Sequence, residues 1–461
     1  MRPVCVVALC GLSLGACTSD PAEQSAEEGS GTTQAVGSST SIPGTDTTTG
    51  DASGSSPTTT GGESSGADEA SSSTQAGSSS TAAGSDSSDG SSSSSTGEAA
   101  SPLPDWEQVG PAQVVCSSAS DHWPPTVAAL DETFAVGCVP TGSQQMFPTV
   151  HFVDETDGEI GSDNLLNSDG YYYLDISLSS YNGRLQATYQ FNCDDNGSWN
   201  EGWGWGCVDF REYDSAGQRL NNATVFGTIG HSGHPVTAWS GSSYGVGWIS
   251  YDDVFFRRLD SDGEVSGGPA DNVHVGPDPE QPDQRDGART KIVWNAERQE
   301  YAIYAISGYN LYRARVGEAG NLLGAPALLT DTAYSQTFGG QFVAAAWGEH
   351  DYLLYHDETD LVLARVFADG GMAEVVVQEG DYRFPSMVAT DEALLVFRTQ
   401  PGTGFGEVLA YDPDLQALPE YTGLLGEGVE MRNPQGAVDP VSGRFAVAYN
   451  DGDDVVLRLV D

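Results

Sequence analysis

From residue 234 the chain reads His234-Pro-Val-Thr-Ala-Trp239, then Tyr244-Gly-Val-Gly-Trp248, then Val254-Phe-Phe-Arg-Arg-Leu259. Turn residues separate these runs, Ser-Gly-Ser-Ser after the first and Ser-Tyr-Asp-Asp after the second. Short runs rich in β-branched and aromatic residues, bounded by such turns, are typical of β-strands joined by hairpins. The stretch therefore predicts three short antiparallel strands.

A similar unit recurs along the chain at a spacing of about 45 to 60 residues. Its copies begin near Pro125, Tyr173, His234, Lys291, Phe342, Pro385 and Pro434. In several copies an arginine on the third strand is followed five residues later by glycine, as in Arg258 and Gly263 or Arg315 and Gly320. A weaker fourth strand is expected beyond that glycine, and helical periodicity is absent.

Four short strands repeated about seven times resemble a seven-bladed β-propeller of four-stranded blades, an all-β fold. The resemblance covers residues 105–461, and a pair of stacked β-sandwiches remains the alternative. The seventh unit ends at Asp461, directly after its third strand. We expect Val109 to Cys116 to supply its missing fourth strand, because this pairing would remove an exposed sheet edge.

The first seventeen residues have the features of an export signal, with one charge, Arg2, before a short apolar run. The run ends in Leu14-Gly-Ala-Cys17, which resembles the lipobox of bacterial lipoproteins. This resemblance implies that Cys17 carries lipid and becomes the mature N-terminus. Thr18, where an aspartate would favour the inner membrane, favours the outer membrane. An ordinary secretory signal is the alternative.

Residues 18–104 are dominated by Ser, Thr, Gly and Ala, with twelve acidic residues and no Lys or Arg. Such a segment buries too little apolar surface to offset its chain entropy, so we expect a disordered tether. As a random coil it would span roughly 50 Å.

The formal net charge of the chain is −48. A surface this acidic repels nucleic acid and anionic lipid, so we expect neither as a partner and membrane contact only through the lipid anchor. We expect a monomer.

Seven cysteines are present, of which Cys116, Cys138, Cys193 and Cys207 lie in the repeat region. An even number in an exported protein predicts two disulfides, although four cysteines allow three connectivities. We pair Cys116 with Cys138, where a bond would secure the ring closure, and Cys193 with Cys207, which flank one hairpin loop.

In a propeller all first strands run the same way beside a central channel. Several bases stand where these strands begin, and a cluster of them in an acidic protein would suit an anionic ligand such as a carboxylate or acidic sugar. They are His122, His234, Arg289, Arg383 and Arg432. The alternative is that they pair with nearby acids and hold blades together.

The loop between Cys193 and Cys207 carries Trp199, Trp203 and Trp205 among glycines, asparagines and acids. These tryptophans could stack on sugar rings, or could pack against the neighbouring blade. Acidic turns between second and third strands could bind Ca²⁺ or could simply be solvated, and otherwise we expect no cofactor. They hold Asp252, Asp253, Asp357, Glu358, Asp360, Asp451, Asp453 and Asp454.

No nucleophile, metal-binding or phosphate-binding motif is visible, so no catalytic residue is nominated. The sequence favours an outer-membrane lipoprotein, on the cell surface or the periplasmic face, whose propeller binds a protein or a glycan without catalysis. The alternative is an exported glycoside hydrolase or lyase, which would need two carboxyl groups roughly 5 to 10 Å apart in a pocket.

Substituting Cys17→Ser should leave an unlipidated precursor, because the thiol is the lipid acceptor. Mass spectrometry of the detergent-extracted protein checks this. A Cys17→Ser protein that still carries lipid would show that the lipobox interpretation is wrong.

Overall fold

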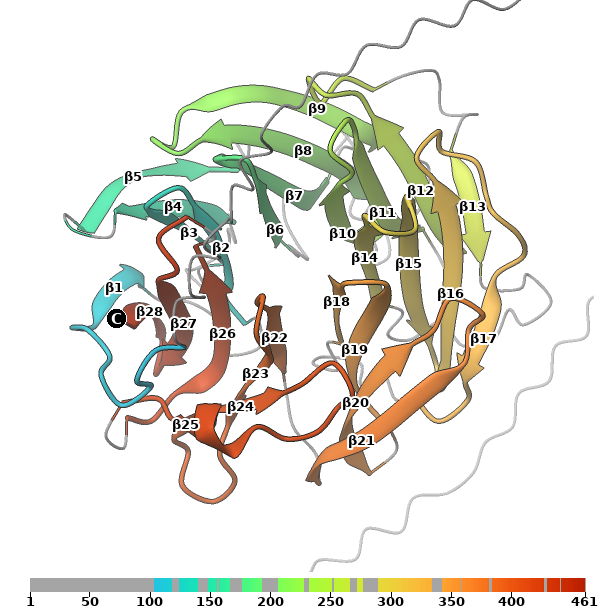
Figure 1. The fold of residues 1–461 in the computed structure, drawn as a ribbon. Helices are drawn as coiled ribbons and strands as arrows, with labels where there is room; N and C mark the ends of the chain where they lie inside the picture. Colours follow the sequence, from blue (N-terminus) through green and yellow to red (C-terminus); the bar gives the residue numbers. More distant parts are fainter. Residues whose placement is uncertain are drawn as a thin grey trace, which may run out of the picture. The chain divides into compact units, whose positions relative to one another are not determined.

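The computed structural model describes residues 103–460, except 118–123, 140–147, 155, 157, 166–175, 193–205, 228–231, 251–252, 266–271, 277–288, 334–341, 358, 381–383, 427–428 and 440. The described residues form seven four-stranded antiparallel sheets. The innermost strands of neighbouring sheets contact one another in a closed cycle (Figure 1). The domain is a seven-bladed β-propeller. The predicted signal and tether lie outside the described residues.

Each blade is one hairpin-connected sheet, numbered here along the chain. Blade 1 is β2 (Thr126–Leu130), β3 (Thr133–Cys138), β4 (Thr149–Asp154) and β5 (Gly158–Asn164). Blade 2 is β6 (Ile176–Tyr181), β7 (Arg184–Asn192), β8 (Gly206–Asp214) and β9 (Arg219–Gly227). Blade 3 is β10 (Ser232–Trp239), β11 (Tyr244–Ser250), β12 (Asp253–Leu259) and β13 (Val273–Gly276).

Blade 4 is β14 (Arg289–Asn295), β15 (Glu300–Ser307), β16 (Asn310–Gly317) and β17 (Ala327–Thr330). Blade 5 is β18 (Val343–Trp347), β19 (His350–His356), β20 (Asp360–Val366) and β21 (Met372–Glu379). Blade 6 is β22 (Ser386–Ala389), β23 (Leu394–Thr399), β24 (Gly406–Tyr411) and β25 (Gly423–Leu424), with the 3-10 turn η2 (Pro419–Tyr421). Blade 7 is β26 (Arg432–Val438), β27 (Phe445–Asp451), β28 (Asp454–Val460) and β1 (Gln113–Cys116).

The core lies between blades, where the faces of neighbouring sheets pack together. A second strand is covered on both faces by its neighbours, so its residues are apolar without alternation. In β15 every residue from Glu300 to Ser307 is buried. One cluster joins Val236 and Phe256 of blade 3 to Tyr301 and Ile303 of blade 4. This arrangement places all seven first strands around the channel.

The arginine and glycine pattern of the repeat has two physical causes. Gly217, Gly263 and Gly320 adopt a left-handed conformation, with φ of 74°, 73° and 86°, in the turn from the third to the fourth strand. The N–H of Gly263 donates to Asp260 O at 3.1 Å, which closes that turn. Third-strand arginines join blades: Arg211 donates to Asp163 Oδ2 at 2.9 Å and Asn164 O at 3.0 Å in blade 1.

The predicted ring closure is confirmed. The outer strand of blade 7 is β1, which pairs antiparallel with β28, and Val109 forms a bridge with Val460 (Figure 1). The Cys116–Cys138 disulfide is also confirmed, and it joins blade 7 to blade 1 with a Cα–Cα distance of 6.6 Å. Cys207 is disulfide-bonded as well, but Cys193 lies outside the described residues, so that pairing stays a prediction.

Among the residues that the structure describes, no helix is long and apolar enough to cross a bilayer.

Trp106, just ahead of β1, should be a main anchor of the closure. Its side chain is 4% exposed, lies 5.2 Å from Phe445 and 6.1 Å from Phe397 between ring centroids, and donates from Nε1 to Tyr421 O at 2.8 Å. Trp106→Ala should lower the free energy of unfolding by about 3–5 kcal/mol. Urea denaturation measures this, with Glu107→Ala at the exposed neighbour as control. Equal midpoints for the two variants would contradict this role.

Candidate functional site

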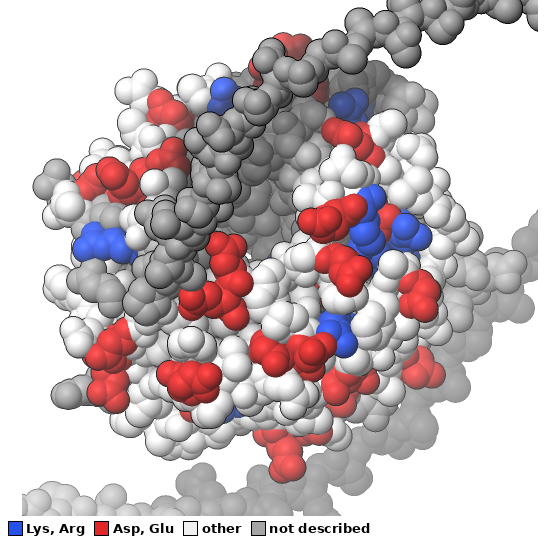
Figure 2. All heavy atoms as spheres, viewed as in Figure 1, with Lys and Arg blue, Asp and Glu red and all other residues white. Residues whose placement is uncertain are grey.

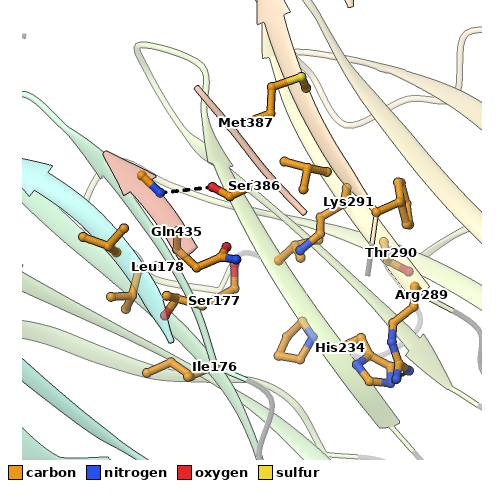
Figure 3. Close-up of a pocket in the computed structure, with 17 residues that line it drawn as sticks. Ile176, Ser177, Leu178, His234, Arg289, Thr290, Lys291, Ser386, Met387 and Gln435 are labelled. Atoms are coloured by element: carbon orange, nitrogen blue, oxygen red, sulfur yellow. Dashed lines mark hydrogen bonds between the residues drawn. The ribbon is translucent and has the colours of Figure 1, made fainter. Parts of the chain in front are cut away.

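A cavity of about 210 Å³ lies in the central channel, and residues from the first strands of all seven blades line it. Strand pairing places the start of each first strand beside the turn between second and third strands: Ser232 pairs with Ser250, and Ser250 with Asp253. We call the side of the ring where the first strands begin the mouth face. Residues far apart in sequence, such as Ser177, Lys291 and Gln435, meet in this cavity (Figure 3).

Three basic residues meet in the cavity. Arg289 and Lys291 are two residues apart on β14, so their side chains leave the same side of the strand. Arg289 is 8% exposed and donates through Nη1 to Nε2 of His234, on the adjacent strand β10. Because a guanidinium only donates, His234 acts here as the acceptor that orients Arg289 and not as a second cation.

The backbone at the start of three of these first strands is strained. His234, Phe384 and Asn433 each have a left-handed φ, between 51° and 56°, and each precedes a proline. A left-handed residue that is not glycine costs of order 1–3 kcal/mol. In β10 and β26 the pairing register shifts across this residue and the proline that follows it.

Neutral polar groups complete the described lining. Gln435 donates through Nε2 to Phe384 O at 3.1 Å, which fixes its amide. The Gly436 N–H donates to Ser386 Oγ at 3.1 Å (Figure 3). The hydroxyl of Thr290, buried at 2% exposure, has no hydrogen-bond partner among the described residues. The lining residues that the structure describes include no Asp or Glu.

The structure thus brings two of the five predicted bases together, His234 and Arg289. Arg432 does not line the cavity: its side chain is 55% exposed and lies 3.4 Å from Glu430 Oε1. His122 and Arg383 lie outside the described residues, as do Trp199, Trp203 and Trp205. For those five positions the predictions remain predictions.

Of the acids in the turns between second and third strands, Asp252 and Glu358 lie outside the described residues, and some of the others have local partners. Asp253 lies 3.0 Å from His274, and Asp357 Oδ1 accepts from the Asp360 N–H at 2.6 Å. Figure 2 shows Asp and Glu spread widely over one side of the ring, with Lys and Arg gathered in a few places. Ca²⁺ binding at these turns stays a prediction.

Among the described residues, one group of three potential metal ligands lies close together. It comprises Cys116, Cys138 and His151. The two sulfurs form the disulfide and are therefore not available as thiolates.

A buried ionic cluster between blades 4 and 5 is structural. Glu300 accepts from Arg315 Nη2 at 2.6 Å and from Arg298 Nε at 2.8 Å, and Arg298 Nη2 also reaches Asp351 Oδ2 at 2.5 Å. Burial alone would raise the pKa of Glu300, but the guanidinium groups of Arg315 and Arg298 hold this pKa below its usual value. The cluster joins the two blades and does not line the cavity.

One carboxyl group differs from this pattern. Burial raises the pKa of Asp209, and hydrogen bonds from Thr224 and Tyr189 oppose that shift only in part. Its Oδ2 accepts from the Tyr189 hydroxyl at 3.0 Å, while its buried Oδ1 has no hydrogen-bond partner in the part of the chain that the structure describes. A raised pKa is a property of general acids, but Asp209 does not line the cavity. The described lining of the cavity therefore contains no carboxyl group with a raised pKa.

The sequence held a signal for the lining that sequence reasoning missed. The predicted bases were taken from the first position of each first strand. The lining comes from two or three consecutive residues at the start of each strand, so the positions that follow also contribute. Ser177, Thr290, Lys291 and Gln435 occupy such positions. Lys291 in particular was recognised as part of a strand but not as a site residue.

No family model matches the chain, and no curated protein matches it. Among solved structures, it is similar to the Dos1 propeller, with 10% identity, a TM-score of 0.49, and coverage of 77% of this chain and 95% of that one. A prolyl endopeptidase has 13% identity and a TM-score of 0.43, and the match covers 75% of this chain and 47% of that one. The Trypanosoma rangeli sialidase has 11% identity and a TM-score of 0.42, and the match covers 75% of this chain and 55% of that one. The chain thus spans about half of the endopeptidase, and TM-scores below 0.5 carry no argument about function.

Asp209→Asn should stabilise the protein at neutral pH. A carboxyl group whose pKa is higher in the folded protein than in the unfolded chain stabilises the fold only while it is protonated. Its contribution to stability is therefore lost as the pH rises from the pKa of the unfolded chain, about 3.9, through the raised pKa of the folded protein. The variant should melt above the wild type at pH 7 and lose this advantage below about pH 4. Asp163→Asn, which removes the negative charge that pairs with Arg211, should instead lower the melting temperature. If the melting temperatures of Asp209→Asn and the wild type differ by the same amount at every pH, the raised pKa of Asp209 is wrong.

Proposed function

We propose that this protein is an outer-membrane lipoprotein whose propeller binds a protein or glycan ligand, without catalysis, at the mouth face of its central channel. The observation that carries the proposal is the cavity itself, a concave site in which all seven first strands converge on two cations, Arg289 and Lys291. Concave sites lined by apolar groups and a few placed polar groups are the usual form of ligand sites.

The charge distribution supports binding at this place. The chain carries a formal net charge of −48, so a site with two cations and no described acid stands out from its surroundings. Charges inside a cleft with low-dielectric walls focus the local field, which favours an anionic group there over the outer surface. Hydrolysis of a glycoside would require two carboxyl groups at the bond, and no described lining residue supplies one.

The predicted anchor and tether are consistent with this role. A head on a long acidic tether can meet ligands well beyond the membrane surface, and electrostatic repulsion keeps the tether extended. The described end of β7, Asn192, pairs with the start of β8, Gly206, at the mouth face. The predicted tryptophan loop connects these two strands in the sequence. We propose that it adds aromatic contacts to the same ligand.

Filling the cavity tests the proposal without changing charge. Ser177 lines the cavity on β6, and Ser180, on the same strand, is exposed and outside it. Ser177→Trp should reduce retention of the full chain, purified in detergent, on an array of bacterial polysaccharides and surface proteins by tenfold or more. Ser180→Trp should not, and circular dichroism confirms that both variants are folded. Equal retention of the two variants, or release of cleaved glycan, would refute a binding site in the channel.

A further inference from the structure

Lys291 is the only lysine in the chain, whose other permanently charged bases are all arginine, and it lies in the central cavity. Arginine and lysine offer different chemistry: arginine presents a planar fork that matches a carboxylate, and lysine presents a compact charge with three donors. On β14 the two stand one pleat apart, with Arg289 nearer the start of the strand. A ligand entering from the mouth face meets the fork of Arg289 first and the ammonium of Lys291 deeper in.

The fork of Arg289 is oriented before any ligand arrives. Its Nη1 donates to His234, and its side chain is 92% buried, since 8% is exposed. His234 itself is held in a left-handed conformation, with φ of 51°, directly before Pro235. An oriented guanidinium loses less rotamer freedom when it binds, which favours bidentate contact with a carboxylate.

The rest of the lining suits a ring that bears hydroxyl groups. Ser177 and Gln435 offer a hydroxyl and an amide group from two different blades, and Figure 3 shows them around the same space as Lys291. Ile176, Val236 and Met387 add apolar surface between them. A sugar presents alternating C–H faces and hydroxyl edges, so it matches such a lining better than an aliphatic acid or a phosphate does.

The size of the cavity limits the ligand. Its volume, about 210 Å³, corresponds to roughly seven molecules of bulk water. This is room for one six-membered sugar ring. If that ring is the terminal residue of a polysaccharide, the other residues extend beyond the space that the described residues enclose.

Resting on the binding function proposed above, we propose that the cavity holds a single terminal acidic sugar of the hexuronate class. The carboxylate binds Arg289 and Lys291, and the ring hydroxyls bind the neutral polar groups contributed by blades 2 and 7. The net charge of the sugar, and not only its shape, selects it.

Calorimetric titration of the full chain in detergent at low salt tests this, with D-glucuronate, its methyl ester and D-glucose as probes. Glucuronate should bind at least tenfold more tightly than the ester or glucose, and added salt should weaken it. Lys291→Gln should lower the affinity for glucuronate at least tenfold. Arg432→Gln removes the same charge outside the cavity and should change little. A uronate trimer with an unmodified non-reducing end should compete, and one blocked at that end should not.

A second measurement does not depend on a variant that folds. Because Lys291 carries the only lysine amine, acetylation of the native protein at this residue is read directly by mass spectrometry. Saturating glucuronate should protect Lys291 from acetylation at least tenfold, and glucose should not.

The outcomes separate this inference from the broader function. If glucose and glucuronate bind equally, or if glucuronate does not protect Lys291 from acetylation, the acidic-sugar site is wrong. A binding site for another ligand in the channel still stands in that case if Ser177→Trp abolishes retention on the array. Competition by an Asp- and Glu-rich peptide in place of uronate overturns it in favour of a protein partner. If Ser177→Trp also has no effect, the binding function fails as well.

Discussion

The structure depends on the pairing of β1 with β28, two strands from opposite ends of the folded region. Each blade buries its faces against its neighbours, so a ring with one incomplete blade would leave an exposed edge and a partly uncovered core. The closing strand supplies backbone partners, and Trp106 and the Cys116–Cys138 disulfide fasten it from its two ends. Because the ring is closed, the seven first strands keep fixed positions around the channel, and Lys291 faces Gln435 although 144 residues, 435 minus 291, separate them.

Arginine is the main polar connector between blades. Arg211 and Arg257 reach backbone carbonyls of the preceding blade, and Arg313 reaches Phe367 O in the following one at 2.8 Å. A guanidinium offers five donors in a fixed plane, so one side chain can satisfy several carbonyl oxygens at a sheet edge, which an ammonium cannot do with the same geometry. These blade-joining arginines lie on third strands, whereas Arg289 and Lys291 lie on a first strand and line the cavity in the channel.

The architecture was predictable because its signals are local and repeated. Runs such as Tyr301–Ser307 identify second strands, the glycine at Gly263 marks a turn that requires a left-handed residue, and the truncated seventh unit indicates how the ring closes. The cavity was only partly predictable. Its members come from seven distant segments, and whether a residue faces the channel or a neighbouring blade depends on register shifts near Gly233 and Arg432 that the sequence does not announce. Arg432 and Arg289 occupy similar positions in the repeat, yet one is exposed beside Glu430 and the other is buried beside His234.

The strained residues at the start of three first strands connect stability to the site. Left-handed conformations before proline are disfavoured twice, once by the Cβ and once by the proline ring, so local preference would not select them. They persist at His234, Phe384 and Asn433 because blade packing and ring closure fix the chain on both sides. Two of the three have a direct role in the cavity: His234 accepts from Arg289, and the carbonyl of Phe384 accepts from Gln435. The stability of the closed ring therefore offsets the strain at the residues that hold the polar groups of the channel.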